Sequence, residues 1–266
     1  MRPAWEDGRV HVSGLFVYPV KSGAAVAVDS WPLAEYGLYR DRQYMVVDAD
    51  GVFLTQREIP RLALLTATLG EPLSLSTPEG TAVAVPGSRC QVRVWEHTGE
   101  AVDCGEDAAQ LISDLVGRPC RLVRVGEEHD RPTELGDGRV GFSDGYPLLL
   151  TSQSSLADLN ARLPRPVPMD RFRPSIVVTG APPWDEDAWL RVHIGPVELD
   201  VVKPCARCAI TRVDQATGVR GDGEPLRTLG RFRKAEGGVM FGQNAVHRTQ
   251  GELRVGDAVR VQRRRP

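Results

Sequence analysis

The residues best suited to chemistry are two cysteines three positions apart, Cys205 and Cys208, in the segment KPCARC. Lys203 and Arg207 lie beside them, and a basic neighbourhood favours the thiolate, which is both the nucleophile and the metal ligand. Three uses compete: a zinc site, a redox dithiol, and a single thiolate that binds a soft metal centre carried by a cofactor. Two ordinary buried cysteines are the commonest alternative.

The surrounding sequence disfavours the first two uses. A zinc site usually takes four ligands, yet Cys90, Cys104 and Cys120 are isolated, and no two histidines lie within a few residues of each other. A thioredoxin-like dithiol sits where a strand leads into a helix, whereas residues 197–202 and 209–213 on both sides of the pair predict strands. The choice between a cofactor ligand and a plain buried pair therefore depends on the rest of the chain.

Polar groups that suit an anion follow a predicted strand at residues 10–20. Lys21 and Ser22 come directly after it and precede a glycine, a combination that can cradle an anion or simply form a turn with a solvated lysine. Ser152 lies just before a predicted helix at residues 154–163. Hydroxyls and free N–H groups at such a helix start either cap the helix or bind a phosphate.

Arginines gather at two further places. Arg40, Arg42 and Arg57 flank a predicted hairpin at residues 43–56, whose turn reads DADG, so the two ends of the hairpin bring them together. Guanidinium groups match phosphate bidentately, although ion pairs with neighbouring carboxylates are an equal alternative.

The second place is the segment RFRPS, which holds Arg171, Arg173 and Ser175. Pro174 favours an extended backbone at Arg173. Residues two apart on an extended chain share a face, so we expect both arginines to reach one anion.

Composition excludes several classes of protein. With 266 residues the chain suits one large or two small domains, and a net charge of −2 does not indicate a nucleic-acid or membrane partner. Five cysteines, an odd number, do not make a disulfide framework and favour a cytoplasmic protein. Residues 1–7 are polar and predict no signal peptide, and no stretch is long and apolar enough to predict a transmembrane span.

The pattern of elements predicts an α+β, β-rich fold. Helical spacing appears at residues 107–115, 154–163 and 224–233. Short apolar runs between glycine- and proline-containing turns predict strands at 10–20, 62–69, 73–76, 82–85, 91–95, 122–125, 176–179, 189–194, 197–202, 209–213, 239–246, 252–255 and 258–262. Residues 126–144 carry only scattered apolar residues and predict a linker, which divides the chain into domains 8–125 and 126–265.

Several segments, in order along the chain, carry a resemblance to a known family. They are LFVYPVKS (15–22), RDR (40–42) with TQR (55–57), RFRPSIVV (171–178), CARC (205–208), EPL (224–226), FGQ (241–243) and VGD (255–257). The chain resembles the MOSC family, named for the C-terminal domain of molybdenum cofactor sulfurases, and within it the two-lobed branch that includes the amidoxime-reducing components. The resemblance implies an N-terminal β-barrel-like lobe, a C-terminal MOSC β-barrel with a few peripheral helices, and a molybdenum cofactor site between the lobes.

In this family the metal is held by the pterin dithiolene and by the second cysteine of the pair, which implies that Cys208 is the metal ligand and catalytic residue and that Cys205 is a neighbour. A thiolate suits this soft site. The positions expected around the pterin and its phosphate match Lys21, Ser22, Arg40 or Arg42, Arg57, Ser152, Arg173 and Ser175. Ser175 stands where the family often has Asn, and serine retains the ability to hydrogen-bond.

The resemblance implies a molybdenum-dependent oxidoreductase that reduces small N-hydroxylated compounds. No cysteine follows Cys208, so the sequence predicts no C-terminal iron–sulfur cluster, and electrons would come from a separate donor protein of the ferredoxin or flavoprotein type. One alternative is a molybdenum cofactor or sulfur carrier with a persulfide on Cys208. Another is a β-rich interaction domain whose cysteine pair is incidental.

Overall fold

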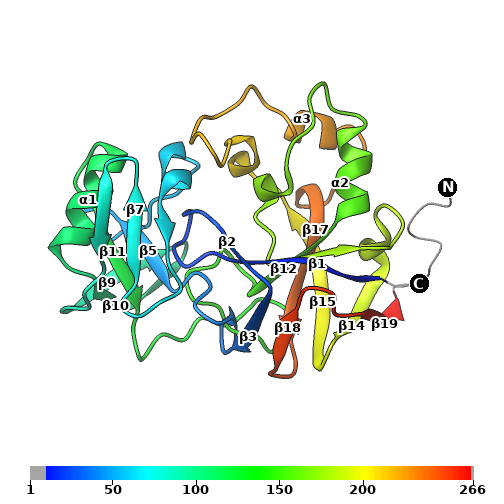
Figure 1. The fold of residues 1–266 in the computed structure, drawn as a ribbon, viewed down its shortest axis with the longest axis horizontal. Helices are drawn as coiled ribbons and strands as arrows, with labels where there is room; N and C mark the ends of the chain where they lie inside the picture. The colour runs from blue at the N-terminus through cyan, green and yellow to red at the C-terminus, as the bar shows by residue number, and fades with distance from the viewer. Residues whose placement is uncertain (1–9, 265–266) are drawn as a thin grey trace.

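The computed structural model describes residues 10–264, which form two lobes lying side by side (Figure 1). The fold is rich in strands with a few short helices, as predicted. The expectation of no signal peptide concerns residues 1–7, which lie outside the described residues. The outer limits of the two predicted domains, at residues 8 and 265, lie outside them as well. Within residues 10–264 no helix has the length and apolar character needed to cross a membrane.

The larger lobe is built on a nine-stranded sheet in which β1 and β2, from the start of the chain, join strands from its second half (Figure 1). Neighbouring strands are antiparallel except for β12 and β13, which run parallel. Along the sheet the order is β19 (Val259–Arg264), β14 (Trp189–Ile194), β15 (Val197–Ala206), β17 (Gly238–His247), β12 (Leu148–Ser152), β13 (Ile176–Thr179), β1 (His11–Val17) and β2 (Val26–Val28), with β16 (Lys234–Ala235) beside β17.

Alternating burial explains this sheet. In β14 the side chains of Val192 and Ile194 are fully buried, and Leu199 and Val201 of β15 pack into the same core. Because β1 pairs with β13, the N-terminal strand belongs to the sheet of the C-terminal lobe. The domain limits 8–125 and 126–265 stay a prediction.

The smaller lobe contains two sheets. One has the order β5 (Tyr44–Val47), β11 (Arg121–Val125), β10 (His97–Asp103) and β9 (Arg89–Val94), and the other joins β6 (Thr66–Ala67), β7 (Ser74–Thr77) and β8 (Gly80–Val83). Helix α1 (Glu106–Val116) buries Ala108, Leu111, Ile112 and Leu115, the apolar stripe that predicted it. A third small sheet of β3 (Ser30–Ala34), β4 (Gly37–Leu38) and β18 (Glu252–Arg254) pairs strands from opposite ends of the chain.

The helices of the larger lobe differ from the prediction in extent and capping. Helix α2 spans Gln153–Asn160, and α3 is a single turn at Leu226–Leu229 where residues 224–233 were predicted helical. Ser152 is the N-cap residue of α2, but its side chain makes no capping hydrogen bond, so the predicted serine cap is wrong. Ser154 Oγ instead donates to the carbonyl of Ala181 at 2.5 Å.

One predicted strand begins as a 3-10 helix and keeps only the short strand β6, a second forms a 3-10 helix, and a third is reduced to isolated bridges. Residues 62–69 open with a 3-10 helix at Pro60–Leu64, because a proline at its first turn fits a helix start and not a strand interior. Residues 209–213 form a 3-10 helix at Ala209–Arg212, stabilised by Thr211, whose N–H and hydroxyl both donate to the carbonyl of Cys208. The second strand of the hairpin at 43–56 is only a pair of bridges at Val52 and Phe53.

The connection between β11 and β12 is packed, although its composition predicts a linker. It joins the two lobes, and Val140 and Phe142 within it are buried at 1% and 0% exposure. Arg131 donates from Nη1 to the carbonyl of Ser143 at 2.5 Å and from Nη2 to that of Asp144 at 2.6 Å. These contacts fix residues 141–144 at the junction of the lobes.

Glu186, in the 3-10 helix Asp185–Ala188, gives the fold a defined pH dependence. Its side chain is fully buried, and burial raises its pKa from 4.5 to about 7, which the neighbouring Ser155 hydroxyl offsets only in part. Between these two values the folded state binds more protons than the unfolded state, so stability falls as pH rises from about 4.5 to about 7. Glu186→Gln is expected to abolish this decline.

Chemical unfolding at pH 5 and pH 8 measures the effect. At pH 8 the variant should be more stable than the unaltered protein by up to about 3 kcal/mol, the equivalent of the pKa shift. An equal pH dependence in both proteins would contradict this role of Glu186.

Candidate functional site

A cavity of about 830 Å³ lies where the two lobes meet. The predicted site residues that line it come from distant parts of the chain: Lys21, Ser22, Arg42, Arg57, Arg173, Ser175 and Cys208. The fold therefore brings most of the predicted set together. Cationic side chains outnumber carboxylates in the lining, with Lys21, Arg42, Arg57, Arg131, Arg173, Lys203 and Arg207 against Glu134, Asp144 and Glu236.

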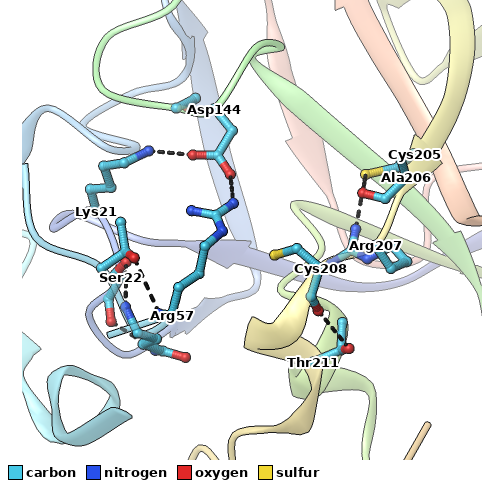
Figure 2. A network of polar contacts seen from close by, with 12 residues as sticks. Lys21, Ser22, Arg57, Asp144, Cys205, Ala206, Arg207, Cys208 and Thr211 are labelled. Carbon is cyan, nitrogen blue, oxygen red and sulfur yellow. Dashed lines mark hydrogen bonds and ion pairs between the residues drawn. The ribbon is translucent and has the colours of Figure 1, made fainter. Parts of the chain in front are cut away.

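Cys208 lies just past the end of β15, at the start of the 3-10 helix Ala209–Arg212. Its carbonyl is fixed by Thr211, from Oγ1 at 3.0 Å and from the backbone N–H at 3.2 Å. Its sulfur points toward the side where Lys21, Arg57 and Asp144 gather (Figure 2). The thiol is free, partly buried and part of the cavity wall, as a ligand for a bound group requires.

Cys205 has a different environment. It lies within β15, and its sulfur accepts a hydrogen bond from Arg207 Nη1 at 2.9 Å (Figure 2). Arg207 is itself held by Nη2, which donates to the carbonyl of Phe172 at 2.6 Å. Within residues 10–264 no group of three or more His, Cys, Asp or Glu side chains is arranged to hold a metal ion.

Lys21 and Ser22 occupy the turn that β1 leads into. Lys21 Nζ donates to the carbonyl of Phe142 at 2.8 Å and forms an ion pair with Asp144. Burial lowers the pKa of Lys21, and the Asp144 carboxylate opposes that shift. Gln56 connects this turn to the smaller lobe, because its Nε2 donates to the Ser22 carbonyl at 2.7 Å.

Arg57 stands between a carboxylate and the cysteine. Its Nη2 donates to Asp144 Oδ2 at 2.9 Å, and its guanidinium lies 4.8 Å from the centre of the Trp95 ring. Burial lowers the pKa of Arg57, but the negative charges of Asp144 and of a Cys208 thiolate outweigh it, so the pKa is raised overall. Nη1 is buried and makes no geometrically regular hydrogen bond among the described residues, although the Cys208 sulfur lies close enough to the guanidinium to interact with it.

Arg42 and Arg173 both face the ring of Tyr18, at 4.1 and 4.3 Å from its centre. Asp41 supports them: its Oδ2 accepts from Arg42 Nη1 at 2.5 Å, and its Oδ1 accepts from the Tyr18 N–H at 2.8 Å. Burial and, to a smaller extent, the nearby Arg42 lower the pKa of Arg173 to about 10, against the opposing effects of Tyr18 and Asp41, and the group stays cationic at neutral pH. Positive charge is therefore concentrated beside the cavity.

The predicted pairing of Arg171 with Arg173 is wrong. Arg173 has a left-handed backbone, with φ of 54°, because it ends the 3-10 helix Met169–Phe172. The two side chains consequently part: Arg171 forms an ion pair with Asp214 at 2.8 Å, whereas Arg173 Nη1 donates to the carbonyl of Gly23 at 2.6 Å. Only Arg173 lines the cavity.

Two predicted residues are not brought to the cavity. Arg40 turns toward the smaller lobe, where it contacts the carbonyl of Gly70 and pairs with Glu71, so Arg42 and not Arg40 is the arginine of that motif that faces the cavity. Ser152 is fully buried at the end of β12 and is absent from the cavity wall. Ser175 does line it, and its Oγ accepts from the Leu149 N–H at 3.3 Å.

Sequence reasoning missed Asp144 and Arg131 because both lie in the segment that predicts a linker. A signal was present, since Asp144 precedes Gly145 and a buried strand, in the way that polar residues often end a loop at a site. Tyr18 was missed for another reason: in a strand motif an aromatic residue normally indicates core packing.

Two family models match the chain: the MOSC N-terminal beta barrel domain over residues 9–119 and the MOSC domain over residues 137–260. Mitochondrial amidoxime-reducing component 1 of Homo sapiens is 37% identical over 93% of this chain and 82% of its own length. The chain belongs to the MOSC family. Mitochondrial amidoxime reducing component 2 of Rattus norvegicus is similar to this MOSC protein at 34% identity, over 93% of this chain and 82% of its own length.

A second group of relatives is longer. The molybdenum cofactor sulfurase of Oryza sativa is 31% identical over 88% of this MOSC protein but only 32% of its own length. The predicted family and its two-lobed branch are confirmed, and so is the link of the family to the molybdenum cofactor. The roles of individual side chains in this protein stay predictions.

Asp41 is expected to stabilise the folded protein by compensating the charges of Arg42 and Arg173. Asp41→Asn leaves Arg42 and Arg173 buried with less compensation, which typically costs about 3 kcal/mol or more when one partner of a buried ion pair is removed. Urea unfolding measures the loss. Asp50→Asn changes an exposed carboxylate on the turn after β5 and should alter the free energy of unfolding by less than about 0.5 kcal/mol.

Proposed function

We propose that this MOSC protein is a molybdenum cofactor-dependent oxidoreductase that reduces small N-hydroxylated compounds with electrons from a separate donor protein. The observation that carries the proposal is the position of Cys208, a free thiol in the wall of a large cavity lined by an excess of cations. The similarity to amidoxime-reducing components over 93% of the chain supports the choice of substrate class.

The residues present fit such a cofactor. A phosphorylated pterin is an anion, and the cavity offers Lys21, Arg42, Arg57 and Arg173 for it. Arg57 Nη1 is a buried donor that makes no geometrically regular hydrogen bond in the described part of the chain, and a bound anion would satisfy it. Cys208 supplies one soft thiolate, the ligand type that suits a metal already carried by a sulfur-rich cofactor.

In the proposed reaction the chain holds, orients and shields the reacting groups. Cys208 would hold the metal through its sulfur, while the hydrogen bonds from Thr211 to the Cys208 carbonyl fix this residue in the cavity wall. The anionic part of the cofactor would be held by the cavity-lining groups Lys21, Ser22, Arg42, Arg57 and Arg173. When bound, the cofactor supplies the two-electron redox chemistry.

The overall reaction balances with an external reductant. Conversion of an N-hydroxylated compound to the parent amine or amidine and one water consumes two electrons and two protons. The family resemblance implies a separate protein of the ferredoxin or flavoprotein type as the electron source. A cytoplasmic location, which the cysteine usage favours, is part of the same proposal.

A second candidate is a molybdenum cofactor or sulfur carrier. The similarity to molybdenum cofactor sulfurase over 88% of the chain favours it, and the partly exposed sulfur of Cys208 suits a persulfide. The two candidates differ in chemistry: a carrier holds sulfur that cyanide removes and reduces no N-hydroxylated compound, whereas a reductase oxidises a chemical electron donor only when such a compound is present.

The ligand assignment predicts opposite results for the two cysteines. After expression in a host that makes molybdopterin, Cys208→Ala is expected to lose molybdenum because the only protein sulfur bound to the metal is gone. Cys205→Ala is expected to retain molybdenum, since Cys205 contacts Arg207 and lies in β15. Metal and pterin analysis of the purified proteins measures both.

Cys205→Ala thus serves as the matched control, being the same substitution three residues away on the same cavity wall. Retention of molybdenum by Cys208→Ala would show the ligand assignment to be wrong. Cyanolysable sulfur on Cys208 without any turnover would favour the carrier.

A further inference from the structure

Asp144 sits over the buried cations of the cavity as an internal anion. Its carboxylate bridges Lys21 and Arg57, with an ion pair to Lys21 Nζ and an N–O distance of 2.9 Å to Arg57 Nη2 (Figure 2). The side chain of Asp144 is 52% exposed, whereas those of Lys21 and Arg57 are 5% and 25% exposed. An accessible carboxylate therefore covers two cations that are otherwise withdrawn from solvent.

The cations are held in place without Asp144. Lys21 Nζ also donates to the carbonyl of Phe142, and Arg57 rests against Trp95. The main chain of Arg57 is contacted by Arg220, whose Nη2 donates to the Arg57 carbonyl. Both cations therefore have contacts that do not involve Asp144.

The carboxylate can leave without a change in the main chain around it. Arg131 binds the carbonyls of Ser143 and Asp144, and Lys21 binds that of Phe142, so the backbone on this side is fixed by contacts independent of the Asp144 side chain. The Asp144 side chain is itself 52% exposed, so it has open space on its solvent side. A rotation of this side chain toward solvent would uncover both cations.

A phosphate would use the site more fully than the carboxylate does. Arg57 Nη1 is buried and makes no geometrically regular hydrogen bond among residues 10–264, so the guanidinium presents one donor that Asp144 leaves unused. A phosphate has more acceptor oxygens and more negative charge than a carboxylate, and it can engage Arg57 through two nitrogens while contacting Lys21.

We propose that Asp144 is a stand-in for a ligand phosphate: it occupies the Lys21–Arg57 site in the free protein and is displaced when a phosphate or phosphomonoester binds there. The identity of the natural ligand, the phosphorylated cofactor, rests on the proposed function. The displacement of Asp144 by a phosphate does not. Asp144 then competes with anions for the site and gives up its place to a phosphate that binds both cations.

The test uses inorganic phosphate and protein produced without cofactor, with binding measured by isothermal titration calorimetry. Asp144→Asn removes the competing charge but keeps the shape, and it is expected to bind phosphate at least about tenfold more tightly than the unaltered protein, equivalent to about 1.4 kcal/mol. The gain should disappear when Arg57→Gln is added, because the site then lacks its main donor.

Glu134→Gln is the matched control. Glu134 is a carboxylate in the same cavity wall that pairs with Lys203 and not with Lys21 or Arg57. It should change phosphate affinity by less than about threefold, since its charge is screened and lies away from the site. Equal or weaker binding by Asp144→Asn, or an equal gain in Glu134→Gln, would overturn the proposal.

A second measurement needs no variant. Crystals of the unaltered protein soaked in phosphate are expected to show the anion on Lys21 and Arg57 with the Asp144 carboxylate turned away. Phosphate bound elsewhere, or bound there with Asp144 still in place, would contradict the proposal. Neither experiment depends on molybdenum. A negative result would therefore contradict the role of Asp144 without bearing on the assignment of Cys208 as metal ligand.

Discussion

The structure depends on one constraint: cationic side chains are buried where the two lobes meet, and each needs a compensating partner. Lys21 and Arg173 are 4% and 8% exposed, and burial lowers the pKa of each. Buried cations are costly unless they are paired or bonded, so the surrounding structure supplies the compensation. Asp41 and the Tyr18 ring do this for the arginines, and Asp144 does it for Lys21.

The topology follows from the need to gather these groups. The first strand, β1, is inserted into the sheet of the C-terminal lobe beside β13, and this brings Lys21 next to the segment that carries Arg173. The same sheet carries β15, which ends just before Cys208. The smaller lobe then closes the site from the other side with Arg57, so neither lobe contains the whole cavity.

Local chemistry in the sequence marked Lys21, Ser22, Arg42, Arg57 and Arg173 as possible anion-binding residues, and the family resemblance singled out Cys208 as the metal ligand. The structure places all six in the wall of one cavity. The regular strands β13 and β14 were predicted with the bounds that the structure has. The orientation of a side chain was harder to predict. Arg40 and Arg42 are two residues apart with left-handed backbones, so pattern alone does not say which faces inward.

Other features required tertiary information. The segment before β12 has no periodicity, and tertiary contacts bring Asp144 into the site through its ion pair with Lys21 and the hydrogen bond from Arg131 to its carbonyl. The β-branched run after Cys208 predicts a strand, but the bonds of Thr211 to the Cys208 carbonyl favour a 3-10 turn. Short local hydrogen bonds of this kind compete with strand pairing, and propensity does not register them.

The central claim is that this charged cavity holds a molybdenum cofactor through Cys208. Anomalous diffraction above and below the molybdenum absorption edge, on crystals of protein from a molybdopterin-producing host, tests it most directly. The account predicts one molybdenum peak inside the cavity at bonding distance from Cys208 Sγ. A molybdenum peak bonded to Cys205, or one outside the cavity, would contradict it.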